Sequence, residues 1–94
     1  MEKILNSIAT RIKYIREHSE NAFILKQCDI IEIKIEELKE RKYDSHAVVE
    51  NICDHIVGYD IDRMKRVAGE TNMVYKKMDE LAGFILDLKE AYFE

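Results

Sequence analysis

The chain has 94 residues, no proline and only three glycines, and 36% of its residues are charged, with a formal net charge of −4. This length suits one small domain over residues 1–94, and the absence of hairpin turn signals such as Asn-Gly or Asp-Gly favours helices over strands. The net negative charge argues against a general electrostatic attraction to DNA or RNA, which needs a clustered basic surface.

Residues 1–15 carry no targeting or membrane signal. Basic residues interrupt this stretch, so we expect neither a secretory signal nor a membrane span. The two cysteines, Cys28 and Cys53, lie among apolar residues and are expected to be reduced, buried thiols. Together these features predict a cytoplasmic protein.

A first helix is predicted over about residues 2–18. Its apolar residues recur at steps of three and four, as on one face of an α-helix. They are Leu5, Ile8, Ile12 and Ile15. The polar run 17–21 interrupts this spacing and predicts a turn, in which Ser19 or Asn21 can cap the next helix.

A second helix is predicted over about residues 21–42. Its inward positions are Ile24, Cys28, Ile31, Ile35 and Leu38. Residues 31–36 also alternate with period two, as a half-buried strand does. We favour the helix because the run continues into strong helix formers and no second strand is present for pairing. On a helix, Ile33 points away from the inward face, where it can serve a subunit contact.

A third helix is predicted to begin near Ser45, with Asp44 or Ser45 as its cap. Its end is ambiguous at Gly58. In one interpretation the helix stops there and Asp60 caps a long C-terminal helix that reaches Tyr92.

In the other interpretation the third helix continues through Gly58 and stops near Gly69. Thr71 or Asn72 then caps a fourth helix, and the fold is an ordinary antiparallel bundle. The apolar spacing is unbroken from Ile61 onward, which favours the first interpretation.

The apolar run from Ile61 to Tyr92 is the strongest helical signal in the chain. Its steps alternate between three and four, and a second apolar row runs beside it. A face this wide is typical of contact with two neighbouring helices, and so small a domain favours self-association. The expected oligomer or partner interface consists of Met64, Val67, Ala68, Val74, Tyr75, Met78, Leu81, Ile85, Leu88 and Tyr92.

These patterns predict an all-α fold. We expect an antiparallel bundle of three to four helices with a long C-terminal helix, assembled as a homodimer.

Four carboxylates form a candidate metal site. Asp29 and Glu32 share one face of the second helix. If the C-terminal apolar face is extended backward through an unbroken helix, Asp54 and Glu50 also point inward. Buried carboxylates are costly unless they are paired or hold a metal. Two such pairs on adjacent antiparallel helices can surround one or two Mg²⁺ ions.

The stretches 28–32 (Cys-Asp-Ile-Ile-Glu) and 49–54 (Val-Glu-Asn-Ile-Cys-Asp) resemble the paired acidic motifs of the MazG-like all-α nucleotide pyrophosphohydrolases. The resemblance covers about residues 25–81. It implies a dimer or tetramer that cleaves nucleoside triphosphates to monophosphate and pyrophosphate with Mg²⁺. Cys28 and Asn51 replace two glutamates of the family pattern.

By this resemblance the metal ligands are Asp29, Glu32, Glu50 and Asp54. Lys76 or Lys77 corresponds to the basic residues that contact phosphate downstream in the family.

The other interpretation is non-catalytic. Small size, acidic charge, a wide apolar face and an incomplete set of family acids favour an interaction protein of the regulator, inhibitor or immunity type. Such a protein associates with itself, binds another protein and needs no cofactor. The MazG-like alternative adds a nucleotide and Mg²⁺, and it requires the four carboxylates to converge.

Overall fold

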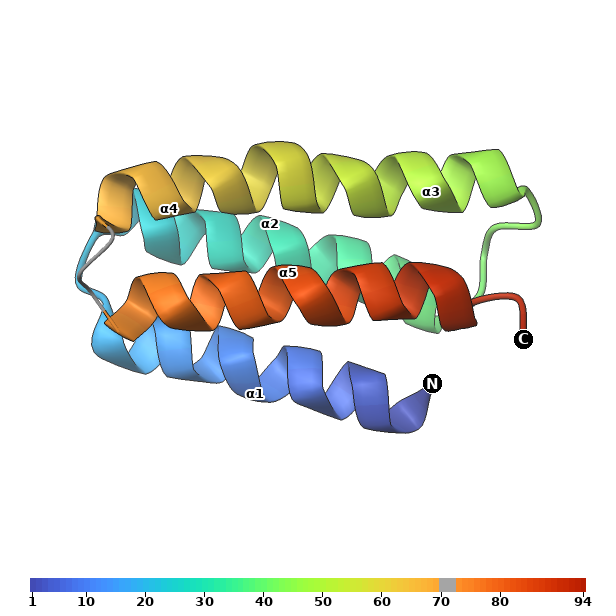
Figure 1. Cartoon of the computed structure of the whole chain (residues 1–94), viewed down its shortest axis with the longest axis horizontal. Helices are drawn as coiled ribbons and strands as arrows, with labels where there is room; N and C mark the ends of the chain where they lie inside the picture. The colour runs from blue at the N-terminus through green and yellow to red at the C-terminus, as the bar shows by residue number, and fades with distance from the viewer. Residues whose placement is uncertain (70–72) are drawn as a thin grey trace.

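The structure is a computed structural model that describes residues 1–69 and 73–94 (Figure 1). The described residues form helices and no strands, which confirms the all-α prediction. In chain order the elements are α1 (Glu2–His18), α2 (Ala22–Lys39), α3 (His46–His55), η1 (Ile56–Ile61), α4 (Asp62–Ala68) and α5 (Met73–Ala91).

Three of these elements form one continuous helical rod. α3, η1 and α4 follow one another without a break over residues 46–68, so the helix passes through Gly58. The predicted helix end at Gly58 is therefore wrong, and so is the single long helix from Asp60 to Tyr92. Gly69, at φ 83°, ends the rod because its left-handed backbone is one that other residues rarely adopt. The predicted caps Thr71 and Asn72 lie outside the described residues.

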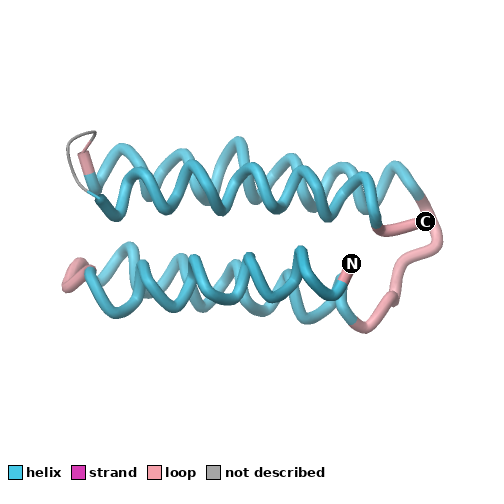
Figure 2. Tube along the Cα trace, turned by 60° about the horizontal axis from the view of Figure 1, so that its bottom comes forward, coloured by secondary structure: helices cyan, strands magenta, loops and turns pink. Residues whose placement is uncertain are grey.

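The helices α1, α2 and α5 and the rod of residues 46–68 pack side by side in a body of 37 × 22 × 18 Å (Figures 1 and 2). α1 contacts α2 and α5, and the rod of residues 46–68 also contacts α2 and α5. α1 and the 46–68 rod thus lie at opposite corners of a four-membered arrangement. Among the described residues, no helix combines the length and the apolar character that a membrane crossing requires.

Local signals set several helix ends. The Asn21 side chain accepts a hydrogen bond from the Ile24 N–H at 3.1 Å and caps α2, as predicted. The Ser45 hydroxyl accepts from the Val48 N–H at 3.4 Å and caps α3. The second helix ends earlier than predicted, because the chain turns at Arg41, which has φ 54°.

The core includes most of the predicted inward positions of the first two helices and of the C-terminal run. Ile8, Ile12 and Ile15 of α1 are buried, and so are Cys28 and Cys53, both as free thiols. The buried-thiol prediction is therefore confirmed. The loop after α2 is fastened to the end of α5, because the Tyr92 hydroxyl bonds both the N–H and the C=O of Tyr43 at 3.3 Å.

Candidate functional site

Most of the predicted partner interface is buried inside the chain itself. Only Val67 is exposed, and Ala68 and Tyr75 are half-buried. The buried members are Met64, Val74, Met78, Leu81, Ile85, Leu88 and Tyr92. The reason is tertiary: α1 packs on one side of α5 and the 46–68 rod on the other, so the wide apolar face contacts two helices of the same chain.

The four predicted metal ligands are divided between two edges of the bundle. On the α1–α2 edge, Arg16 forms ion pairs with both Glu32 and Asp29, the latter at 2.5 Å. On the α3–α5 edge, Lys89 bonds Asp54 at 2.9 Å, and this hydrogen bond raises the pKa of Lys89.

Glu50 is exposed on the same α3–α5 edge as Asp54. Within the described ranges, no three His, Cys, Asp or Glu side chains lie together so that they could hold a metal ion. The four carboxylates therefore do not converge within one chain, as the MazG-like alternative requires.

The π-helical turn η1 explains why Glu50 and Asp54 stay outside. The helix is unbroken, as their inward placement required, but its register changes between α3 and α4. Ile56 and Ile61 are both buried although they are five residues apart, a step that a π turn with its i to i+5 hydrogen bonds accommodates. The extra residue rotates α3 relative to α4, so Val49 faces the core in place of Glu50.

The same turn brings a different carboxylate inside. Asp60 is only 3% exposed, and its Oδ2 lies 2.6 Å from the Lys34 Nζ of α2. His55 Nδ1 lies 3.3 Å from that nitrogen and 3.9 Å from the carboxylate oxygen. The sequence interpretation treated Asp60 only as a possible cap. The five-residue step between Ile56 and Ile61 is the signal that could have revealed it.

A groove opens next to this ion pair, between α2 and α3. α2 packs against η1 and α4 rather than along α3, so the two helices leave a hollow of about 360 Å³. Its walls are Lys34, Glu37, Tyr43, Asn51, Ile52 and His55. The Tyr43 hydroxyl donates to Glu37 at 2.6 Å, which steadies one wall.

Apolar side chains surround the groove. Ile33 is 62% exposed and shares a helix face with Glu37, four residues on. Val48 and Tyr59 are exposed on the facing rod, and the Tyr59 ring lies 4.8 Å from that of His55. We call this surface the α2–α3 face and define it by Ile33, Val48, Ile52, His55 and Tyr59.

The face ends in opposite charges. Glu37 lies at the α3 end, beside Asn51 and Ile52. Arg63 lies at the α4 end, with its guanidinium 4.9 Å from the rings of both Phe23 and Tyr59. No carboxylate within the described part of the chain forms an ion pair with Arg63.

The two predicted phosphate-contacting lysines differ in their surroundings. Lys76 is exposed on α5. Lys77 is half-buried, 3.3 Å from Glu80 and 5.4 Å from the centre of the Tyr14 ring. The structure therefore places only Lys77 in a polar cluster.

Comparison of the sequence with protein-family models gives no match, and neither curated proteins nor solved structures show significant similarity to it. The resemblance to the MazG-like hydrolases therefore stays a prediction.

Proposed function

We propose that the protein is a small, non-catalytic interaction protein that forms a homodimer through its α2–α3 face and acts by binding another protein. The observation that carries this proposal is the exposure of Ile33, Val48 and Tyr59 around one groove. Burial of such side chains against a partner is favourable at about 25 cal/mol per Å² of apolar surface.

A second copy is the occupant that fits the charges of the face. In a two-fold interface, the same patch of both subunits is buried and each residue meets its partner's counterpart. If the two faces pack antiparallel, Arg63 of one subunit, whose Nη1 donates to the Tyr59 hydroxyl at 3.0 Å, lies over the Glu37 end of the other. Ile33 and Tyr59 then lie near the two-fold axis, where two copies of each are removed from water.

The proposal assigns the C-terminal helix a different role from the one expected from sequence. α5 supplies the core of each subunit, and α2 with the 46–68 rod supplies the contact. The dimer offers the outer surfaces of its helices to a partner protein, in the manner of a regulator, inhibitor or immunity protein.

The decisive test is the mass in solution. Light scattering at micromolar concentration should return the mass of a dimer for the wild type. Ile33→Asp should return a monomer, and because Ile33 is exposed, it should change the free energy of unfolding by only about 0.5 kcal/mol. Leu86→Asp is the matched control, since Leu86 is exposed on α5, away from the face, and this variant should stay dimeric.

Charge reversal tests the antiparallel arrangement. Arg63→Glu and Glu37→Arg should each weaken the dimer, and the double variant should recover much of the loss, since it restores opposite charges across the interface. A wild-type monomer, or a dimer that Leu86→Asp disrupts and Ile33→Asp does not, would overturn the proposal.

A further inference from the structure

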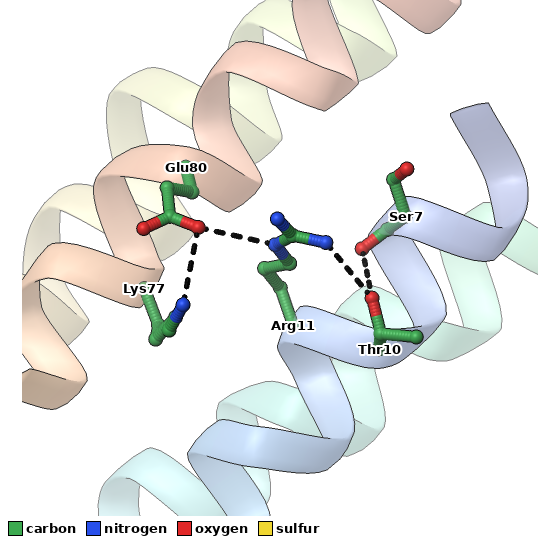
Figure 3. A network of polar contacts seen from close by, with 5 residues as sticks. All are labelled: Ser7, Thr10, Arg11, Lys77 and Glu80. Carbon is green, nitrogen blue, oxygen red and sulfur yellow. Dashed lines mark hydrogen bonds and ion pairs between the residues drawn. The ribbon is translucent and has the colours of Figure 1, made fainter. Parts of the chain in front are cut away.

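The edge between α1 and α5 carries a polar cluster that the proposed dimer does not use. Figure 3 shows its members: Ser7, Thr10 and Arg11 from α1, and Lys77 and Glu80 from α5. The two helices pack together along their length, so the cluster lies at a closely packed helix pair.

Two cations in this cluster share one carboxylate oxygen. Glu80 Oε1 lies 3.2 Å from Arg11 Nε and 3.3 Å from Lys77 Nζ. Partial burial raises the pKa of Glu80, but the hydrogen bonds from Lys77 and Arg11 outweigh this effect and lower it. One negative charge thus faces two positive charges, in a chain whose overall charge is −4.

Both cations are held in place by further contacts. The guanidinium of Arg11 lies 4.8 Å from the centre of the Phe84 ring, and its Nη1 donates to the Thr10 hydroxyl at 3.1 Å. That hydroxyl in turn donates to the Ser7 carbonyl at 2.9 Å. The Arg11 and Lys77 side chains are only 29% and 27% exposed. They therefore lose little further conformational entropy when a ligand binds.

A hollow of about 270 Å³ lies between them, lined by Thr10, Arg11, Tyr14 and Lys77. An arginine carries five N–H donors and a lysine three. Most of these donors on Arg11 and Lys77 have no acceptor among the described residues.

We propose that this hollow binds the phosphoryl group of a small ligand, either free inorganic phosphate or a phosphomonoester. Donors reach the hollow from two helices. A phosphoryl group presents three acceptor oxygens to such donors, one more than a carboxylate. The remaining N–H groups of the guanidinium donate to these oxygens, and the lysine supplies a point charge.

Neighbouring lysines provide a matched pair of variants. Lys76 is exposed on the same helix and lies outside the hollow. Lys77→Gln and Lys76→Gln remove the same charge from adjacent positions, so their difference isolates the local contact from the change in net charge.

The experiment is a titration of the full chain with inorganic phosphate and with AMP, followed by amide chemical shifts and by calorimetry. Chloride at the same ionic strength is the control. Phosphate should shift amides of residues 10–14 and 77–80. Lys77→Gln should weaken binding about tenfold, because a charge-assisted hydrogen bond is lost. Lys76→Gln should leave the affinity within about twofold, since an exposed charge is screened.

Glu80→Gln tests the expected direction of the change in phosphate affinity. Removal of the competing carboxylate should strengthen phosphate binding roughly fivefold, whereas damage to the fold would weaken it. AMP binding with no response to inorganic phosphate would assign the site to a phosphomonoester. A response to acetate equal to that to phosphate, equal losses in Lys77→Gln and Lys76→Gln, or no saturable shift would overturn the proposal.

Discussion

The α1–α5 edge and the α2–α3 edge of this bundle are built differently. Along the first, helices pack closely, and polar residues at the rim form a connected network. Along the second, α2 and α3 leave a groove, and a π-helical turn places the buried Asp60 opposite Lys34. α2 also carries Gln27, whose buried Oε1 has no hydrogen-bond partner within the described part of the chain.

This difference separates the part of the molecule that maintains the fold from the part available for contact. A buried polar atom without a partner and an ion pair across two helices are both costly compared with apolar packing. Exposed apolar residues such as Ile33 also contribute little to the stability of an isolated chain. The α1–α5 edge is therefore the stable side, and the α2–α3 edge is the side on which a partner can add most to stability.

The largest expected effect is the loss of unfolding free energy when a buried apolar side chain is shortened. We expect this loss to be larger in α5 than in the wall of the α2–α3 groove. Leu81→Ala, in α5, removes a side chain with no exposed surface and should cost about 3 kcal/mol. Ile52→Ala, in the half-buried wall of the groove, should cost about 1 kcal/mol. Urea unfolding of both variants measures the difference, and equal costs would show that the two edges are equally packed.

The second prediction concerns the ion pair at the π turn. Lys34→Ala leaves the Asp60 carboxylate buried without its cation, which should cost about 2 kcal/mol at neutral pH. Urea unfolding of the wild type and of the variant at neutral pH measures this difference.

Replacement of both partners separates pairing from packing at this site. Lys34→Met with Asp60→Leu should be closer to wild type than Lys34→Ala alone. A double variant less stable than the single one would contradict the pairing argument.

At neutral pH the smallest expected effect is in the two buried thiols, Cys28 of α2 and Cys53 of α3. Burial raises the pKa of both Cys28 and Cys53 to about 11, from an ordinary value of 9.0. The unfolded chain ionises first as the pH rises, so stability should fall between pH 9 and 11.

Below pH 9, a thiol reagent should label Cys28 and Cys53 of the native protein only as fast as the structure around them opens. Comparison of labelling rates with amide exchange in α5 then shows whether α2 and α3 open independently of α5. Fast labelling of the native protein at neutral pH would contradict the burial of the two thiols.

Sequence patterns predicted much of the fold because they are local. The three-and-four spacing of Ile8, Ile12 and Ile15 placed α1 at its observed bounds, and Asn21 was among the predicted caps of α2. The inward positions of α5 were also read correctly as a face for two helices. Each of these depends on residues within a few turns of one another.

The candidate sites depended on contacts between distant segments. The polar cluster of the α1–α5 edge joins Arg11 to residues of α5, and neither stretch has a motif that reveals the other. The split of the predicted metal ligands followed from one extra residue in a helical turn. Extending the register back from Ile61 gave Glu50 and Asp54 the wrong face, although the helix itself was continuous.

The sequence alone determined that the chain is helical, where its first helices begin, and which residues of each helix are apolar enough to be buried. Only the tertiary structure decided which helix covers the face of α5 and how the register passes through η1. The physical reason is that periodicity acts within one helix. A π turn and a buried ion pair such as Lys34–Asp60 are selected by how two helices fit together.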